Sequence, residues 1–401
     1  INVSDFSMLL DGERFNANLL LENLDDYTWD LKVNGAADLE KMTKIFPLDG
    51  MTLAGKVKAD IKTKGKYSDL NAQRYDRLPT SGTASVKNFK YTTADLPPVA
   101  LTEAVMVFDP KKIDLQKMIG TIGKSDFDVK GAVLNYLGFV LGKNETIKGT
   151  VSYRANLLDL NEFMTDSEAE QTSTDTAAGV IPIPKNIDFN LQTQVKTIKM
   201  TNLVLTDASG SVILKDGVAN LSGLRFNMLG GTFGVDGTYS TKDIAHPRYD
   251  LALKIENVSL KEASNTSSLV KTYAPIAGLM DGNFSTNFKI NGELGQDMMP
   301  DPATVSGEGL IKIAQATLKQ SKLLSGISSL TNLNEGGSNS MSLKDVLMSA
   351  SIKDGKLSVK PFDAKLGNYT TTIAGSTSLN GIMDYTLKMN LPQNKISAQY
   401  N

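Results

Sequence analysis

The chain has 401 residues, of which 41% are hydrophobic and 21% charged, and its formal net charge is −2. This charge argues against a nucleic-acid-binding protein, because such a protein needs a basic surface to displace counterions. Cys is absent and His246 is the single histidine, which excludes disulfides, thiolate nucleophiles, Cys-ligated metals and histidine-based triads. The composition therefore favours a folded protein without a cofactor, a metal or the commonest acid–base chemistries.

The beginning of the chain has a strand-like pattern and lacks the charged and apolar succession of a secretion signal. The longest apolar stretch, residues 132–142, is interrupted by Asn135 and is shorter than the roughly 20 residues that span a bilayer. We therefore expect the chain to be a fragment or a processed product, with any membrane anchor outside it.

Apolar and polar residues alternate with period two along most of the chain. The pattern predicts antiparallel strands with one apolar face and one solvated face. Asn-Gly and Asp-Gly pairs separate many of these segments and match tight hairpin turns. The sequence therefore predicts a mostly β protein built as a long meander of strands.

Helical spacing is confined to a few short segments. The sequences Asp159–Glu162 and Ser259–Glu262 resemble capping boxes, in which an N-cap oxygen is followed three residues later by Glu. The predicted helices span residues 37–46, 160–165, 260–280 with a break at Pro275, and 319–333, and a short turn is expected at 342–347.

Residues 165–179 are acidic, rich in Ser and Thr and free of large apolar side chains, which is typical of a mobile connection. We therefore predict a linker at 165–187 between an N-terminal β half, 1–164, and a C-terminal β half, 188–401. The two halves share a segment, since Gly55-KVKADIKTK-Gly65 aligns without a gap to Gly282-NFSTNFKIN-Gly292. Each copy follows a short Leu-x-Lys helix that ends in Pro, which indicates duplication with inserted helices.

The second half resembles the AsmA family of periplasmic proteins, which are anchored in the inner membrane of Gram-negative bacteria. The resemblance lies in an order of strand, Asp-Gly, strand, Gly-Gly, strand and Asp-Gly between residues 184 and 392. The first 164 residues match in style only. The segments that carry it are PKNIDFNLQTQVKTIKMTNL, VILKDGVANLSGLRFNMLGGTFGVDGTY, PRYDLALKIENVSL and FDAKLGNYTTTIAGSTSLNGIMDYTLKMNLP.

The resemblance implies a long, strongly curved antiparallel sheet with a few short helices, related to bridge-like lipid-transfer proteins. In such proteins the apolar inner face forms a groove for the acyl chains of phospholipids. The expected function is therefore non-enzymatic lipid binding and transfer in the periplasm, in support of outer-membrane assembly or homeostasis. The expected partners are phospholipid or another lipid, the membrane through a segment outside this chain, and envelope proteins.

The alternation supplies candidate lipid-binding residues for the inner face, although a shift of one residue in register would exchange them for their neighbours. An ordinary protein core is the alternative interpretation of the same side chains. The 15 methionines of the chain suit irregular partners such as acyl chains. The candidates are Val57, Ile61, Val151, Tyr153, Leu224, Phe226, Met228, Phe233, Val235, Leu251, Leu253, Ile255, Phe284, Phe288, Leu387 and Met389.

Other interpretations stay open at this point. The chain would also suit a structural or protein-interaction scaffold of the cell envelope, made of closed β-sandwiches. A glycan-acting enzyme would need a carboxylate pair facing one cleft, and no spacing singles one out. The lysines at 56, 58, 62, 64 and 66 fit the solvated face of a strand or a contact with anionic headgroups. The carboxylates of Asp25–Asp26 and of residues 297–301 are candidate Ca²⁺ ligands but lack the EF-hand order.

Overall fold

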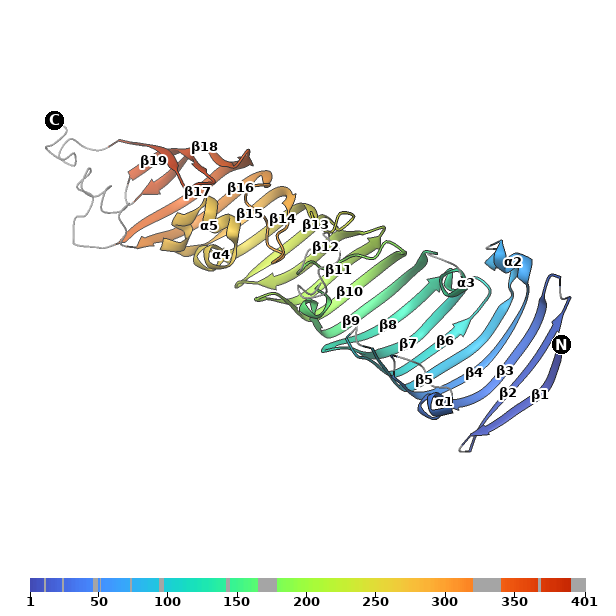
Figure 1. Ribbon diagram of the computed structural model, residues 1–401. Helices are drawn as coiled ribbons and strands as arrows, with labels where there is room; N and C mark the ends of the chain where they lie inside the picture. The colour runs from blue at the N-terminus through green and yellow to red at the C-terminus, as the bar shows by residue number, and fades with distance from the viewer. Residues whose placement is uncertain are drawn as a thin grey trace. The chain divides into compact units, whose positions relative to one another are not determined.

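The protein is mostly β, as predicted from the alternation: strands make up 69% of the computed structural model and helices 12% (Figure 1). Its twenty strands are assigned to one sheet that does not close on itself. The chain divides into two compact units, which are described separately. The structure describes residues 1–10, 12–23, 25–45, 50, 52–72, 74–93, 97–141, 145–164, 179–319, 340–366 and 369–390.

Unit 1 comprises Ile1–Met164 and Pro182–Ala219, and its strands bow along their length (Figure 1). Consecutive strands pair antiparallel from β1 to β9 and again between β10 and β11. Its strands are β1 (Asn2–Leu10), β2 (Glu13–Glu22), β3 (Thr28–Asp38), β4 (Thr52–Lys66), β5 (Thr80–Thr92), β6 (Val99–Phe108), β7 (Lys112–Ile122), β8 (Ser125–Leu134), β9 (Ile147–Asp159), β10 (Ile187–Met200) and β11 (Leu203–Lys215). Its helices are α1 (Leu39–Ile45), α2 (Tyr67–Asn71), η1 (Tyr75–Arg77), α3 (Tyr136–Leu141) and η2 (Leu160–Phe163).

Unit 2 comprises Thr165–Ile181 and Asn220–Asn401. From β13 to β20 its consecutive strands also pair antiparallel. Its strands are β12 (Val218–Met228), which begins at the end of unit 1, β13 (Gly231–Ser240), β14 (Arg248–Ser259), β15 (Met280–Glu293), β16 (Ser306–Lys319), β17 (Ser340–Lys353), β18 (Lys356–Leu366), β19 (Tyr369–Ser378) and β20 (Met383–Met389). Its helices are α4 (Leu260–Thr266), α5 (Ser268–Tyr273) and η3 (Pro275–Leu279).

The register of the strands gathers apolar side chains on one face within each unit, because directly opposed residues lie on the same side of a sheet. In unit 1, Ala17 lies opposite Val33, which lies opposite Ile61. In unit 2, Val235 lies opposite Leu253, which lies opposite Phe288. The polar residues between them, many of them charged, therefore lie on the other face.

Several aromatic rings of the apolar face lie over a glycine of a neighbouring strand. A Cβ at Gly309 would lie 2.6 Å from Cδ2 of Phe288, and one at Gly149 would meet the ring of Phe189. Glycine in a strand interior costs conformational entropy and leaves a gap in the packing. The rings fill these gaps, which explains why glycines occur at apolar-face positions of the strands.

The predicted helices agree with the helices of the structure to different degrees. Helix α1 falls within 37–46, as predicted, and the predicted helix at 160–165 is the shorter 3₁₀-helix η2. The segment 260–280 folds as three pieces, α4, α5 and η3, and η3 begins at Pro275 as the predicted break requires. The N-cap bond of the predicted capping box at Ser259 is present, since its Oγ accepts a hydrogen bond from the backbone N–H of Glu262 at 3.3 Å.

The predicted turn at 342–347 is wrong, because these residues lie inside β17. Strand β17 pairs with β16 along most of its length, and this pairing overrides the local Ser-x-x-Asp signal of a helix start at Ser342. The predicted helix at 319–333 lies outside the described residues from 320 onwards, and Lys319 ends β16.

One pairing departs from the antiparallel rule, since β9 and β10 pair in parallel. Parallel neighbours need a connection of about a dozen residues or more. Residues 160–186 supply that length, and they include the acidic segment, of which 165–178 lie outside the described residues. The division into two halves around a linker at 165–187 stays a prediction. Residue contacts group Pro182–Ala219 with unit 1.

Candidate functional site

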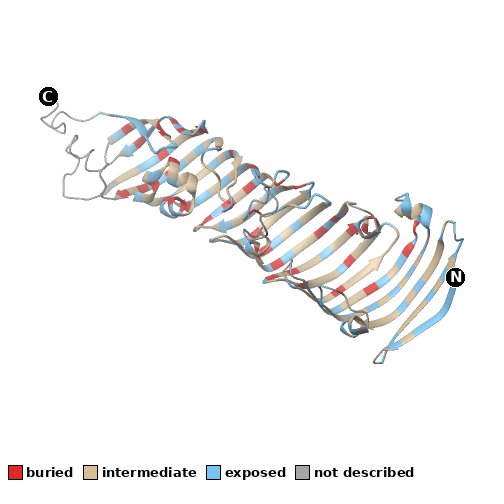
Figure 2. Ribbon diagram, in the orientation of Figure 1, coloured by how far each residue is buried: buried red, intermediate tan, exposed pale blue. Residues whose placement is uncertain are grey.

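An apolar surface of unit 1 is the first candidate site, and we call it the open face. All its members lie on one side of the sheet by register, and each is of intermediate exposure, with none buried (Figure 2). Strand β1 continues this side with Val3 and Phe6, which are 40% and 46% exposed. The members of the open face in β2, β3 and β4 are Phe15, Ala17, Leu19, Leu21, Trp29, Leu31, Val33, Val57, Ala59 and Ile61.

Trp29, the only tryptophan of the chain, is held in place on the open face. Its indole Nε1–H donates to Oγ1 of Thr63 at 3.5 Å, a long and weak hydrogen bond. A Cβ at Gly65 would lie 2.6 Å from Cη2 of the indole and from Cδ2 of Leu78, so the ring fills the space above this glycine. The indole therefore occupies a defined position over Gly65 and beside Thr63.

The same side of the sheet is more deeply buried from β5 onwards. Ala84 in β5, Ala104 in β6 and Leu115 in β7 are at most 9% exposed, and Val151 in β9 is 5% exposed. Val86, Met106 and Met118 on the same side are of intermediate exposure, so from β5 onwards this side mixes buried and half-exposed positions. The members of the open face, by contrast, are all half-exposed.

In unit 2 the corresponding side forms a core beneath helices, and we call it the covered face. Leu260 of α4 and Ala277 of η3 pack in one cluster with Ile313 and Val346 of the sheet, and Val346 is 1% exposed. A second cluster centres on Tyr273 of α5, whose hydroxyl donates to the carbonyl of Pro302 at 2.7 Å. The helices bury the part of this face that contributes to the two clusters, whereas Phe226, Leu251 and Phe288 on the same side are of intermediate exposure.

The sixteen candidates from the sequence separate into these two environments. Val57 and Ile61 belong to the open face, and Val151 and Tyr153 lie on the same side of β9. Burial raises the pKa of Tyr153 to about 12, so its phenol stays neutral. Most of the candidates of unit 2 pack on the two clusters described or on a third one around Phe233, Val258 and Ala263. Val235 is 6% exposed and Leu387 is 43% exposed. The candidates of unit 2 are Leu224, Phe226, Met228, Phe233, Val235, Leu251, Leu253, Ile255, Phe284, Phe288, Leu387 and Met389.

Sequence reasoning missed the members of the open face in β2 and β3. The segment Trp29-Asp-Leu-Lys-Val-Asn34 alternates strictly, so the signal was present in β3. In β2 the run Leu19-Leu-Leu21 obscures the alternation, and only the register with β3 separates Leu19 and Leu21 from Leu20. These strands supply seven of the ten members.

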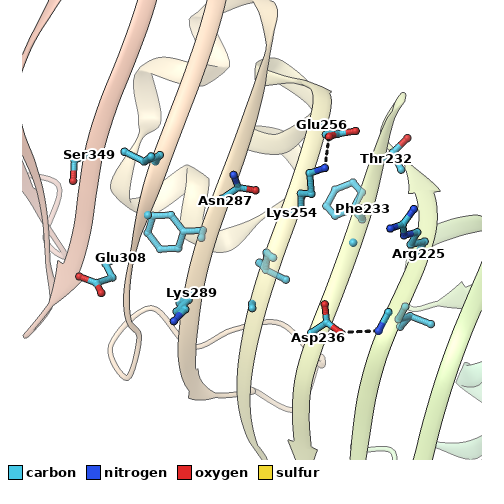
Figure 3. Close-up of a pocket in the computed structure, with 18 residues that line it drawn as sticks. Arg225, Thr232, Phe233, Asp236, Lys254, Glu256, Asn287, Lys289, Glu308 and Ser349 are labelled. Atoms are coloured by element: carbon cyan, nitrogen blue, oxygen red, sulfur yellow. Dashed lines mark hydrogen bonds and ion pairs between the residues drawn. The ribbon is translucent and has the colours of Figure 1, made fainter.

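The polar side of unit 2 holds a second candidate, a hollow of about 590 Å³ (Figure 3). The residues around it form a row across neighbouring strands, in which Lys254 lies opposite Asn287. Lys254 also forms an ion pair with Glu256 at 2.9 Å, and the carboxylate of Asp236 accepts from the backbone N–H of Gly223 at 2.7 Å. Three of the charged side chains around the hollow are thus engaged by the protein itself.

The acidic pairs considered for Ca²⁺ are engaged by the protein itself. Asp26 accepts from the backbone N–H and the hydroxyl of Ser68, and these bonds lower the pKa of its carboxyl group. Asp297 and Asp301 each accept a backbone N–H two residues further on. Among the described residues, no group of three or more acidic or histidine side chains is arranged to hold a metal ion.

Comparisons with known proteins found no matching family model, no matching curated protein and no matching solved structure. Within the described part of the chain, no helix combines the length and the apolar character needed to cross a membrane.

Proposed function

We propose that this protein binds lipid without enzymatic activity, and that the open face of unit 1 contacts the acyl chains. The observation that carries the proposal is the half-exposed state of ten apolar side chains on three adjacent strands. Contiguous exposed apolar surface of this kind marks binding sites in soluble proteins. Burying it against an acyl chain gains about 25 cal/mol per Å², and no chemistry is required.

The proposal extends to the AsmA type of lipid-transfer protein, with a periplasmic location and a role in outer-membrane assembly or homeostasis. It rests there on the resemblance of the second half. The contacts in unit 2 favour a lipid site with fewer residues than the alternation suggested, because candidates such as Phe288 and Leu251 pack on the cluster that contains the helix residue Tyr273. We therefore assign the acyl chains to unit 1.

A scaffold function is supported by a different observation, the covered face of unit 2. Its clusters resemble the filled interior of a closed domain, since Val346 and Ala316 are at most 1% exposed. Under this alternative the protein would carry no lipid at all.

The single tryptophan gives a direct test, because Trp29 lies on the open face. Phospholipid with brominated acyl chains should quench the emission of Trp29 when it binds, since bromine quenches only at short range. Native mass spectrometry of the protein purified from a bacterium should show bound phospholipid. A lipid-free protein that shows no quenching with brominated lipid would overturn the proposal.

A pair of variants locates the site. The double variant Val33→Asp/Ile61→Asp places two charges on directly opposed residues of the open face and should abolish acyl-chain binding at this face. The control Ala36→Asp/Ser81→Asp adds the same charges on the other face, opposite Lys58 and Lys62, and should bind lipid normally. Circular dichroism checks that both variants keep the strand content.

A further inference from the structure

The solvated side of β4 carries an unusual row of charge, which we call the lysine row. Lys56, Lys58, Lys62, Lys64 and Lys66 alternate with the apolar residues and are all exposed. Asp60 is the only acidic member of the same side of the strand. At about 3.4 Å per residue the row is roughly 35 Å long.

The duplicated strand shows that a solvated strand face does not require these lysines. In the gapless alignment of β4 with β15, the positions of Lys56, Lys58 and Lys64 are occupied by Asn283, Ser285 and Asn291. Both strands pair antiparallel on both sides, so their outer faces have similar surroundings. The positive charge is therefore a property of unit 1.

The neighbouring strand β3 neutralises only part of this charge, because Asp38 and Asp30 lie opposite Lys56 and Lys64 but no acidic residue of β3 lies opposite Lys58 or Lys62. Lys62 lies directly opposite Lys32 of β3, and like charges in this position destabilise a sheet. The lysine of β15 that aligns with Lys62 is Lys289, which lies opposite Glu308. Within the described part of the chain, neither Lys32 nor Lys62 takes part in an ion pair, although Lys56 and Lys64 pair with Glu13 and Asp30.

We propose that the lysine row, with Lys32, docks unit 1 on the surface of an anionic phospholipid bilayer. Clusters of four to eight basic side chains bind such surfaces, with about 1 kcal/mol from each Lys near the surface. A protein partner fits less well, because Lys is depleted from protein interfaces and the row has no aromatic or Arg anchor. The site lies opposite the open face and does not depend on the proposed function.

Vesicle binding tests the proposal. The wild-type protein should sediment with vesicles of phosphatidylcholine and phosphatidylglycerol, should stay in solution with pure phosphatidylcholine, and should be released by high salt. The triple variant Lys32→Gln/Lys58→Ser/Lys62→Gln should bind the anionic vesicles at least about tenfold more weakly. The control Lys289→Gln/Lys312→Gln/Lys353→Gln removes three exposed lysines of unit 2 and should bind like wild type.

Three results would overturn the proposal: equal binding to both kinds of vesicle, equal losses in the triple variant and its control, or displacement from the vesicles by an equal charge concentration of duplex DNA or polyglutamate. The variant Val33→Asp/Ile61→Asp separates this site from the acyl site. It should still sediment with anionic vesicles even though its open face no longer binds lipid. The vesicle-docking proposal and the acyl-chain proposal can therefore fail independently of each other.

Discussion

The duplicated segment permits a comparison of the two units strand by strand. Strand β4 is preceded by residues 39–51, which hold the short helix α1, and β15 is preceded by residues 260–279, which hold α4, α5 and η3. The apolar positions align, with Ile61 of β4 matching Phe288 of β15. The longer insertion lies over the apolar side of its own sheet and forms the covered face. In unit 1, where the insertion is shorter, the apolar side includes the open face.

The comparison teaches that the same strand pattern yields either a core or an accessible surface, depending on the connection beside it. An amphipathic strand supplies apolar area on one side, and the free energy of burying that area is realised only when something covers it. In unit 2 the chain covers itself. In unit 1 the uncovered area is available to a ligand.

The largest expected effect comes from placing a charge on the covered face. Val346→Asp introduces an unpaired carboxylate at a position that is 1% exposed, and we expect a loss of more than about 4 kcal/mol in the free energy of unfolding of unit 2. Val33→Asp on the open face leaves its charge accessible to water and should cost about 1–2 kcal/mol.

Guanidinium unfolding followed by two signals measures this difference. Circular dichroism reports both units, and the emission of Trp29 reports unit 1. Val346→Asp should abolish part of the transition in circular dichroism and leave the Trp29 transition in place. If both variants lost equal stability, the distinction between covered and open faces would be wrong.

A matched pair of leucines sharpens the comparison at smaller cost. Leu260 in α4 is 7% exposed and belongs to the covering layer, whereas Leu31 in β3 is of intermediate exposure. Leu260→Ala should cost about 2–5 kcal/mol, since it leaves a cavity between helix and sheet. Leu31→Ala should cost about 1 kcal/mol. Equal losses in urea unfolding would show that the open face is as tightly packed as the covered one.

The alternation predicted the strands and their apolar side, and helical spacing and capping predicted the places of α1 and of the helices after Ser259. It did so because period and capping are local properties, visible in segments such as Tyr249–Ile255. What covers the apolar side is not local. Nothing in the pattern shows that Phe288 packs against a cluster with the helix residue Tyr273 and that Ile61 lies on the open face. The parallel pairing of β9 with β10 was hidden for the same reason, since it depends on a long connection.

Hydrogen bonds from a side chain to the backbone of the next strand also hold unit 1 together. The carboxylate of Asp126 accepts from the backbone N–H groups of Asn156 and Leu157, the latter at 2.6 Å. Burial raises the pKa of Asp126, but these hydrogen bonds outweigh it and the pKa is lowered overall. The hydrogen bonds therefore join β8 to the C-terminal part of β9 through an ionised group.

The sign of the pH effect follows from this lowered pKa. A carboxylate with a lower pKa in the folded state stabilises the protein above its unfolded-state pKa, about 3.9, and the stabilisation is lost as the pH falls through the folded-state value. Asp126→Asn should cost about 1 kcal/mol at neutral pH, and wild type and variant should converge in acid. Urea midpoints from the Trp29 signal at several pH values measure this, and a difference that persisted in acid would contradict the assignment.

The smallest expected effect distinguishes the outer faces of the two units by its sign. Lys62 lies opposite Lys32, so Lys62→Gln relieves a like-charge contact and should raise the melting temperature slightly at low salt. Lys289 aligns with Lys62 but lies opposite Glu308, so Lys289→Gln should lower it. Salt should reduce both shifts, because the side chains are exposed. Shifts of the same sign in calorimetry would mean that the surroundings of the two aligned lysines do not differ as the register indicates. The like-charge contact at Lys62 would then be no argument for an anionic binding partner.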